Sequence, residues 1–522
     1  MDLSTLSPEQ KFAFQRFIQN ENIFLTGQGG TGKTRLIEYF ARHCKDIGQS
    51  VQVCALTGCA TILLPKICNA RTIHSWSGIR LCRGPNQSIV SNALRTKASK
   101  AAWRKARVLI VDEVSMMSVK MFEVLDEIAR AARANNRPFG GLQIVFVGDF
   151  YQLPPVGTAG DPDTDRFCFE SPLWNRVFPA RNHIELLTVF RQVDPLYREI
   201  LSQIRTATLS EESIRTLNGY VKREYDSTKY NGCVPPKLYP VRAKADYLNN
   251  LMYSKLDGEE RSFECVKKTS CKTFLEANTP LSIAHLERGR SLTPAETEFE
   301  LAQLMNTSAF QECLALKIGA VVMCTVNLDM DQGICNGSQG IVTSIIETSK
   351  GYFPIVKFTN GVERTIYMHY IQSDEYPTIA VGQIPLCLSW AMTIHKIQGA
   401  TLPMASIDVG GQIFEYGQTY VALSRVESLD GLYLTAFHAE KVRANERVIE
   451  FYSKMLKQNY VLAENTSEQL NSGDESRGIS KQAAVLTTTN VFKQFAYSEL
   501  GLSSKELGEE EYVDPTIKRI VL

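Results

Sequence analysis

The chain has 522 residues, a formal net charge of +1 and 22% charged residues. This length predicts about three or four packed domains, and a charge near zero neither requires nor excludes a nucleic-acid partner. The sequence has no apolar run of about 18 or more residues, and its first residues lack the basic start and apolar core of a signal peptide. We therefore expect a soluble intracellular protein without a membrane partner. Thirteen cysteines without a CxxC pair and seven histidines without metal-ligand spacing argue against a disulfide scaffold and a zinc site.

The first strong pattern along the chain is a glycine-rich loop at residues 27–34. An apolar run of strand length precedes it, and apolar residues at helical spacing follow it. The pattern is typical of a phosphate loop, in which backbone N–H groups wrap the phosphates and a lysine neutralises the terminal pair. The sequence therefore predicts nucleotide binding by Gly27, Gln28, Gly29, Gly30, Thr31, Gly32, Lys33 and Thr34.

Acidic residues follow two further apolar runs, which we expect to be buried strands. Asp112 and Glu113 follow Val108–Val111. The carboxyl ends of parallel strands meet bound ligands, so Asp112 is expected to hold Mg²⁺ with Thr34, and Glu113 to activate the attacking water. After the run 142–147, Gln152 is suited to sensing the γ-phosphate of ATP.

The rest of the chain indicates a second α/β unit and an insertion. Short apolar runs at 183–187, 237–241, 384–389, 404–409 and 432–437 predict strands of a second parallel sheet without its own phosphate loop. Residues 320–370 change to strand-like segments separated by Asn-Gly and Lys-Gly turns, which favours a small inserted β-barrel. Residues beyond about 463 are polar, which is typical of a flexible linker.

Longer motifs carry a family resemblance. The segment "SMMSVKMFEVLDEIARAARANNRPFGGLQIVFVGDFYQLPPV" strongly resembles the signature of the Pif (petite integration frequency) helicases, which are RecD-like members of helicase superfamily one. The segments "LTVFRQ", "LSWAMTIHKIQGATL" and "YVALSRV" resemble later motifs of this family in the same order. The resemblance spans roughly residues 6–437, but it does not include residues 257–314 or the C-terminal tail.

The resemblance implies an α/β fold with two RecA-like parallel-sheet motor domains that sandwich ATP. It implies a first motor domain at 1–180 with a small wedge insertion at about 59–105, and a second at 181–241 plus 376–460. It also implies an insertion at 242–375 with an SH3-like β-barrel at about 316–372, followed by a linker and tail at 461–522. The basic run 80–107, which carries eight lysines or arginines and no acidic residue, is expected to face DNA at the fork.

Individual roles follow from the matched motifs. Arg191 and Arg425 match the arginines that the second domain supplies to the γ-phosphate, and Gln10 matches the adenine-reading glutamine. Strand contacts are expected, by the same resemblance, from Thr57, Gly58, Thr72, His74, Ser75, Thr393, His395, Lys396 and Gln398. Such hydroxyls, amides and a lysine suit phosphate contacts, which carry no sequence information.

The predicted activity is ATP-dependent, Mg²⁺-requiring translocation on single-stranded DNA, with 5′-to-3′ polarity implied by the resemblance. Forked or tailed duplex DNA is the expected substrate, and a monomer the expected active form. The tail is a candidate site for a protein partner. The alternatives are a DNA-stimulated ATPase that acts as a clamp or remodelling switch, and a small-molecule kinase, which does not explain Arg191 or Arg425. The nucleus, the bacterial cytoplasm and the cytoplasm of a virus-infected cell stay open as compartments.

Overall fold

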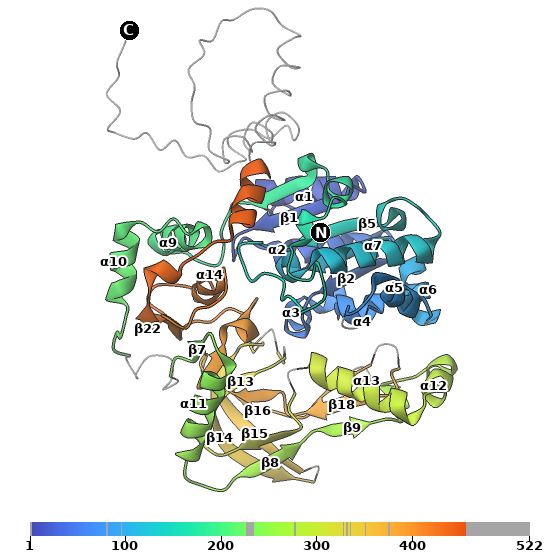
Figure 1. Ribbon diagram of the computed structural model, residues 1–522. Helices are drawn as coiled ribbons and strands as arrows, with labels where there is room; N and C mark the ends of the chain where they lie inside the picture. The colour runs from blue at the N-terminus through green and yellow to red at the C-terminus, as the bar shows by residue number, and fades with distance from the viewer. Residues whose placement is uncertain are drawn as a thin grey trace, which may run out of the picture.

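The computed structural model describes residues 3–79, 82–95, 97–225, 234–275, 278–308, 310–326, 328–329, 332–334, 336–349, 351–373 and 376–455. The linker and tail expected at 461–522 lie outside this part of the chain. Figure 1 shows two α/β units side by side, with a β-rich region below them.

The first unit is built on a six-stranded parallel sheet in the order β3-β2-β4-β5-β1-β6. Its strands are β1 (Ile23–Gly27), β2 (Val51–Ala55), β3 (Arg71–Thr72), β4 (Val108–Asp112), β5 (Gln143–Val147) and β6 (His183–Leu186). The central strands β1, β4 and β5 are buried at every position, as their continuous apolar runs predict for a sheet covered on both faces.

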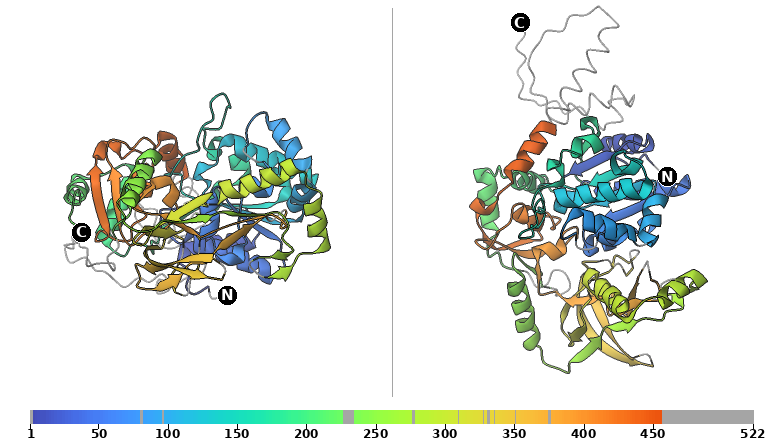
Figure 2. Two further views of the ribbon diagram at one scale, coloured as in Figure 1. Left: turned by 90° about the horizontal axis from the view of Figure 1, so that it is seen from below. Right: turned by 45° about the vertical axis from the view of Figure 1, so that its right-hand side comes forward.

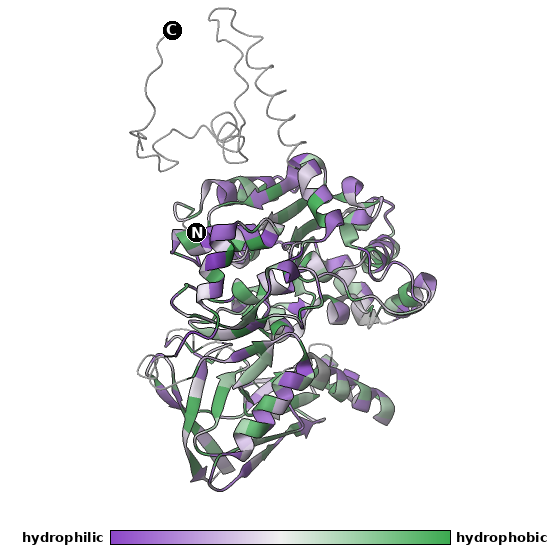
Figure 3. Ribbon diagram, turned by 60° about the vertical axis from the view of Figure 1, so that its left-hand side comes forward, coloured by the Kyte–Doolittle hydropathy of each residue, from purple (hydrophilic) through white to green (hydrophobic). Residues whose placement is uncertain are grey.

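Helices cover both faces of this sheet. They are α1 (Pro8–Ile18), α2 (Lys33–Asp46), α3 (Gly58–Leu63), α4 (Ile73–Ser77), α5 (Asn86–Arg95), α6 (Lys97–Lys105), α7 (Val119–Arg133) and α8 (Trp174–Val177). Alternate residues of one strand enter different cores: Leu25 packs with residues of α1 and α2, while Phe24 packs with those of α7 and α8. In Figure 3 the helices carry both hydrophilic and hydrophobic residues, as expected of helices with one buried face.

The second unit is a four-stranded parallel sheet in the order β20-β7-β21-β22. Its strands are β7 (Lys237–Tyr239), β20 (Ala391–Thr393), β21 (Ala405–Val409) and β22 (Leu432–Phe437). The helices of this unit are α9 (Pro195–Thr206), α10 (Glu211–Gly219), α11 (Arg242–Ser254) and α14 (Gln418–Leu423). A last helix at 446–455 crosses to the first unit, where Phe451 packs against Phe24, Phe150 and Trp174.

The β-rich region contains a five-stranded antiparallel sheet in the order β16-β15-β14-β13-β19, together with smaller sheets. Its strands are β8 (Arg261–Glu264), β9 (Val266–Lys268), β10 (Thr273–Phe274), β11 (Thr279–Pro280), β12 (Cys313–Leu316), β13 (Val321–Cys324), β14 (Gln339–Thr348), β15 (Gly351–Phe358), β16 (Glu363–Thr365), β17 (His369–Gln372), β18 (Ala380–Gln383) and β19 (Leu386–Leu388). Two helices, α12 (Ile283–Arg290) and α13 (Pro294–Thr307), belong to the same region.

Two strand assignments made from the sequence were wrong. β6 pairs with β1 in the first sheet, so the first unit extends to Leu186, past the expected boundary at 180. β19 pairs with β13 in the inserted sheet, so the insertion reaches Leu388 rather than 375. Both errors have one cause: a short apolar run predicts a buried strand but does not say which sheet it joins.

Candidate active site

The phosphate loop joins β1 to α2, as the sequence predicts. Three of its glycines have positive φ values, 139° at Gly27, 89° at Gly30 and 80° at Gly32. Space is also limited, because a Cβ at Gly27 would lie 2.5 Å from the Leu186 carbonyl oxygen and one at Gly30 would lie 2.6 Å from Arg191 Cβ. Other residues would therefore strain this loop, which accounts for the glycine pattern.

Lys33 lies at the first position of α2. Its Nζ donates hydrogen bonds to the carbonyl oxygens of Gly27, at 2.6 Å, and Gln28, at 3.0 Å. Burial lowers the pKa of Lys33, and Asp149, Glu113 and Asp112 oppose this shift because their negative charges stabilise the ammonium form. The lysine and the carboxylates that the sequence predicted for catalysis thus lie within one electrostatic neighbourhood.

Asp112 and Glu113 lie at the carboxyl end of β4. Burial, with Glu113 as the next cause, raises the pKa of Asp112 to about 7, so a bound cation would compete with a proton below that pH. Glu113 has a left-handed backbone conformation, with φ 58° and ψ 39°, which a non-glycine residue rarely adopts outside constrained sites. Its Oε2 accepts a hydrogen bond of 3.1 Å from Gln398 Nε2, which also lies 3.4 Å from Gln152 Oε1.

The donors present fit Mg²⁺ held together with a nucleotide. No group of three or more His, Cys, Asp or Glu side chains in the described part of the chain is placed to hold a metal ion by itself. Mg²⁺ is usually held by one or two carboxylates, water and substrate phosphates rather than by a complete protein cage. The Thr34 hydroxyl, in the first turn of α2, and the Asp112 carboxylate are the groups that would serve such an ion beside the loop.

Two arginines that follow the first sheet along the chain reach this loop. Arg425, only 2% exposed, donates from Nη2 to Ser424 Oγ at 2.8 Å. That nitrogen lies 3.5 Å from the position of a Cβ at Gly29. Arg191 donates to the Ser424 carbonyl at 3.2 Å, and burial followed by Arg425 lowers its pKa to about 10. Because the positive charge of Arg425 disfavours the charged form of Arg191, a phosphate, which would supply the opposite charge, suits this place beside the loop.

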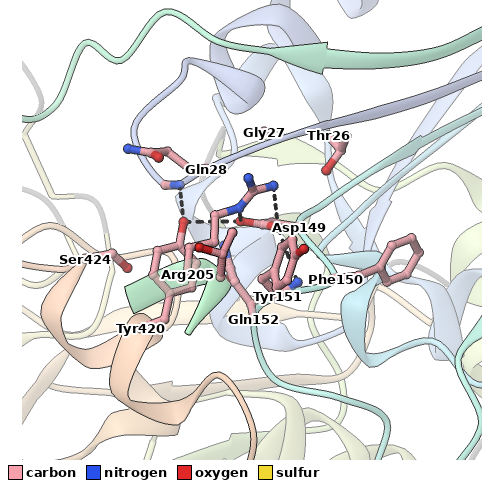
Figure 4. A network of polar contacts seen from close by, with 12 residues as sticks. Thr26, Gly27, Gln28, Asp149, Phe150, Tyr151, Gln152, Arg205, Tyr420 and Ser424 are labelled. Atoms are coloured by element: carbon pink, nitrogen blue, oxygen red, sulfur yellow. Dashed lines mark hydrogen bonds and ion pairs between the residues drawn. The ribbon is translucent and has the colours of Figure 1, made fainter. Parts of the chain in front are cut away.

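A buried network around Asp149 links the two units (Figure 4). Asp149 is fully buried, and its carboxylate receives hydrogen bonds from Arg205 Nε at 2.9 Å and Nη2 at 3.1 Å. The hydroxyls of Tyr420 and Tyr452 donate to the same carboxylate at 3.2 and 3.4 Å. The Tyr420 hydroxyl also accepts a 2.8 Å hydrogen bond from Gly29 N–H. The network thus ends at the phosphate loop.

Sequence reasoning missed three members of this network. Tyr420 stands within "YVALSRV", a motif already recognised, so that match could have pointed to it. Arg205 and Tyr452 are 56 and 303 residues from Asp149 in the chain, and no local pattern marks either of them. Arg205 and Tyr452 reach Asp149 only because of the way in which the two units pack together.

Gln10 lies beside the loop but is already engaged in local structure. It is fully buried and forms a capping box with Ser7 at the start of α1. Its Nε2 donates to the Thr31 carbonyl at 3.2 Å. Its role in reading adenine stays a prediction.

The first-domain residues predicted to contact DNA lie mainly along one groove of about 960 Å³. Gly58, Thr72, His74 and Ser75 line one wall. The facing wall comes from the inserted region and includes Phe274, Arg288, Phe299, His369 and Tyr370. Figure 2 (right) shows helices α12 and α13 below the first unit. Thr57 caps α3 through a hydrogen bond from Ala60 N–H, so its side chain has a structural role.

The second-domain residues predicted to contact DNA do not share one location. Thr393 ends β20 and is buried, His395 is exposed with its ring against Phe414, and Gln398 lies in the nucleotide cleft on Glu113. Lys396 belongs to a 3-10 helix at Ile394–Ile397, and its side chain lies outside the described residues. The position of Gln398 favours a link between nucleotide and strand over a direct strand contact.

The basic run expected at the fork is partly structural. Arg80 lies outside the described residues. Trp76 and Trp103 are buried, with ring centroids 4.4 Å apart, and Arg104 donates to the Ala132 carbonyl at 2.7 Å. These side chains fix α6 against the first unit.

The fold and the cleft define a class of protein: a P-loop ATPase with two RecA-like parallel-sheet units. Arg425 of the second unit and Arg191 of the connection between the units reach the phosphate loop of the first. None of the described helices is long and apolar enough to cross a bilayer.

Comparisons with known proteins narrow this class to one family. A family model described as PIF1-like helicase matches residues 5–211, and one described as DNA helicase Pif1, 2B domain, matches residues 300–345. The human protein named ATP-dependent DNA helicase PIF1 is 31% identical over 480 residues, which cover 91% of this chain and 67% of that protein. The chain thus spans about two thirds of this curated relative.

Solved structures agree. Pif1 helicase from Candida albicans is 31% identical, with a TM-score of 0.69 and coverage of 87% of this chain and 100% of that one. Bacteroides Pif1 bound to ssDNA is 26% identical, with a TM-score of 0.56 and coverage of 88% and 98%. The chain belongs to the Pif1 family of ATP-dependent DNA helicases, with ATP hydrolysis as its reaction and ATP and Mg²⁺ as its cofactors.

Proposed function

We propose that this chain translocates 5′-to-3′ on single-stranded DNA and unwinds forked or tailed duplexes during replication, repair or recombination. The proposal rests on two features that occur together, a nucleotide cleft and a separate groove. The nucleotide cleft is formed by residues of both units, and the groove lined by Thr72, His74 and Ser75 runs between the first unit and the insertion.

In this proposal each residue of the cleft has its own role in ATP hydrolysis. Lys33 neutralises the terminal phosphates, Thr34 and Asp112 hold Mg²⁺, and Glu113 takes a proton from the attacking water. Gln152 senses the γ-phosphate. Arg191 and Arg425 stabilise the charge that develops on it, and a change in the cleft shifts the two units relative to each other.

Gln398 gives this coupling a physical link. It hydrogen-bonds Glu113 and Gln152, and it follows directly on the segment that contains His395. A movement of this segment on a DNA strand would therefore shift a hydrogen-bond partner of Glu113. We infer that strand binding stimulates hydrolysis through this residue.

A test of the strand groove uses two of its cations, Lys66 and Arg71, both replaced by Ala. We expect weaker binding of a fluorescent oligothymidylate and a shallower dependence of log K on log salt. The slope should fall by about 0.7 for each phosphate that the variant no longer neutralises. The DNA concentration that half-stimulates ATP hydrolysis should rise in parallel.

The matched control replaces Lys45 and Lys255, two exposed lysines outside the groove, with Ala. The control should bind the strand like wild type. Wild-type affinity and salt slope in the groove variant would place the strand elsewhere.

We propose a monomer as the active form, with the nucleus, the bacterial cytoplasm or the cytoplasm of a virus-infected cell as its compartment. The motor domains are proposed to follow the two parallel sheets, and the residue 461–522 tail is a candidate site for a protein partner.

A further inference from the structure

The Tyr420 hydroxyl is held between the phosphate loop and Asp149. It accepts a hydrogen bond of 2.8 Å from Gly29 N–H and donates one of 3.2 Å to Asp149 Oδ2. The side chain is 1% exposed and comes from α14, in the second unit. A backbone group of the phosphate loop is therefore paired with a side chain from the opposite side of the cleft.

Asp149 keeps the Tyr420 hydroxyl in this orientation. Arg205 binds both carboxylate oxygens of Asp149, and its third contact is to Glu185 at 3.1 Å. Because the carboxylate only accepts hydrogen bonds, the Tyr420 proton points toward Asp149 and a lone pair faces Gly29. The hydroxyl is thus fixed as an acceptor for the loop.

Gly29 lies in the part of the loop that faces Arg425 and Ser424. A Cβ at this position would lie 3.5 Å from Arg425 Nη2 and 3.5 Å from Ser424 Cβ. Loop N–H groups are the groups that wrap phosphate oxygens. The Arg425 guanidinium beside Gly29 indicates the terminal phosphate as the one nearest this residue. One N–H group does not donate strongly to two acceptors, so the Tyr420 hydroxyl and a terminal phosphate oxygen are alternatives at this nitrogen.

We propose that Tyr420 is a positioning residue that distinguishes ATP from ADP: its hydroxyl holds Gly29 N–H until a γ-phosphate oxygen replaces it. The exchange breaks one hydrogen bond between α14 and the loop, while the Tyr420 hydroxyl keeps its hydrogen bond to Asp149. Arrival of the γ-phosphate is thereby transmitted to the second unit. This inference rests on the proposed ATP site and adds a discriminating group to it.

The test is nucleotide affinity in the Tyr420→Phe variant, measured by calorimetry with Mg²⁺ and either ADP or a non-hydrolysable imido analogue of ATP. The substitution removes a hydrogen bond from the arrangement that competes with the γ-phosphate. The Kd of the ATP analogue should fall about fivefold, the equivalent of one buried hydrogen bond, while the Kd of ADP stays nearly constant. Equal changes for both nucleotides, or weaker binding of the analogue, would overturn the proposal.

Tyr452→Phe is the matched control. Tyr452 also donates to Asp149, but its hydroxyl contacts Thr26 Oγ1, at 2.6 Å, and Phe150 N–H rather than Gly29. Each variant lacks one hydroxyl that donates to Asp149. A general loss of order around this carboxylate would therefore change nucleotide binding by the same amount in both variants. We expect no selective change for the ATP analogue in Tyr452→Phe, and the same selectivity in both variants would contradict the proposal.

Lys33→Ala separates this inference from the ATP site itself. That variant should lose affinity for both nucleotides, and unchanged binding would refute the site as a whole. If Tyr420→Phe does not fold, 3-fluorotyrosine at position 420 gives a second readout. Its ¹⁹F resonance should shift with the ATP analogue and not with ADP, and a shift with both or with neither would reject the exchange.

Discussion

Arg425→Ala is expected to lower the rate of ATP hydrolysis by about 10³–10⁵-fold, the range that an arginine finger contributes to phosphoryl transfer. The guanidinium is buried beside Gly29 and Ser424, where it would meet charge that grows on the γ-phosphate in the transition state. ATP affinity should fall much less, because the interaction strengthens mainly in the transition state. Steady-state hydrolysis with saturating single-stranded DNA, beside nucleotide titration, separates the two quantities.

Two variants control this experiment. Arg443→Ala removes an arginine of the second unit whose contacts are to the Phe414 carbonyl and the Tyr416 ring, away from the cleft, and should hydrolyse ATP like wild type. Arg425→Lys keeps the charge but not the planar fork, so it should restore only part of the rate. A rate within about tenfold of wild type in Arg425→Ala, a difference of only about 1.4 kcal/mol in the barrier, would remove this residue from the chemistry.

Glu113→Gln is expected to slow hydrolysis by about 10²–10⁴-fold, the usual contribution of a general base. The amide cannot accept the proton of the attacking water, yet it has nearly the same shape and its oxygen can still accept the hydrogen bond from Gln398 Nε2. Binding of ATP and of single-stranded DNA should therefore persist. Single-turnover hydrolysis measures the chemical step directly.

The comparison for this variant is Glu212→Gln, at the exposed first turn of α10, which should leave the rate unchanged. A single-turnover rate in Glu113→Gln that matches wild type would mean that another group activates the water. Weaker ATP binding with an unchanged chemical step would instead assign Glu113 to the binding of the nucleotide.

The parts of the site that the sequence predicted are those that local patterns encode. Glycines with positive φ and a following helix define the phosphate loop, and acids after a buried run mark the end of β4. Residues close together in the sequence are enough to predict these features, because the loop and the elements on either side of it contain the whole pattern.

The remainder depends on tertiary structure. The apolar sequences of β6 and β19 do not indicate which sheet each strand joins. Arg205 and Tyr452 reach Asp149 only when the two units are packed together. Gln398 stands among residues that resemble a strand-binding motif, but the fold turns its amide toward Glu113. Polar residues of one motif can therefore belong either to the nucleotide cleft or to the DNA contacts, and their spacing in the sequence does not show which.

The central claim, that this cleft drives movement along a DNA strand, is tested most directly by unwinding of two matched partial duplexes. One carries a 5′ single-stranded tail and the other a 3′ tail, and each is mixed with the protein, Mg²⁺ and ATP. We expect strand separation only from the 5′-tailed duplex, and none with Glu113→Gln. If single strands stimulate hydrolysis while neither duplex opens, the motor is contradicted and the protein acts as an ATP-driven clamp. Opening only from the 3′ tail would refute the proposed polarity.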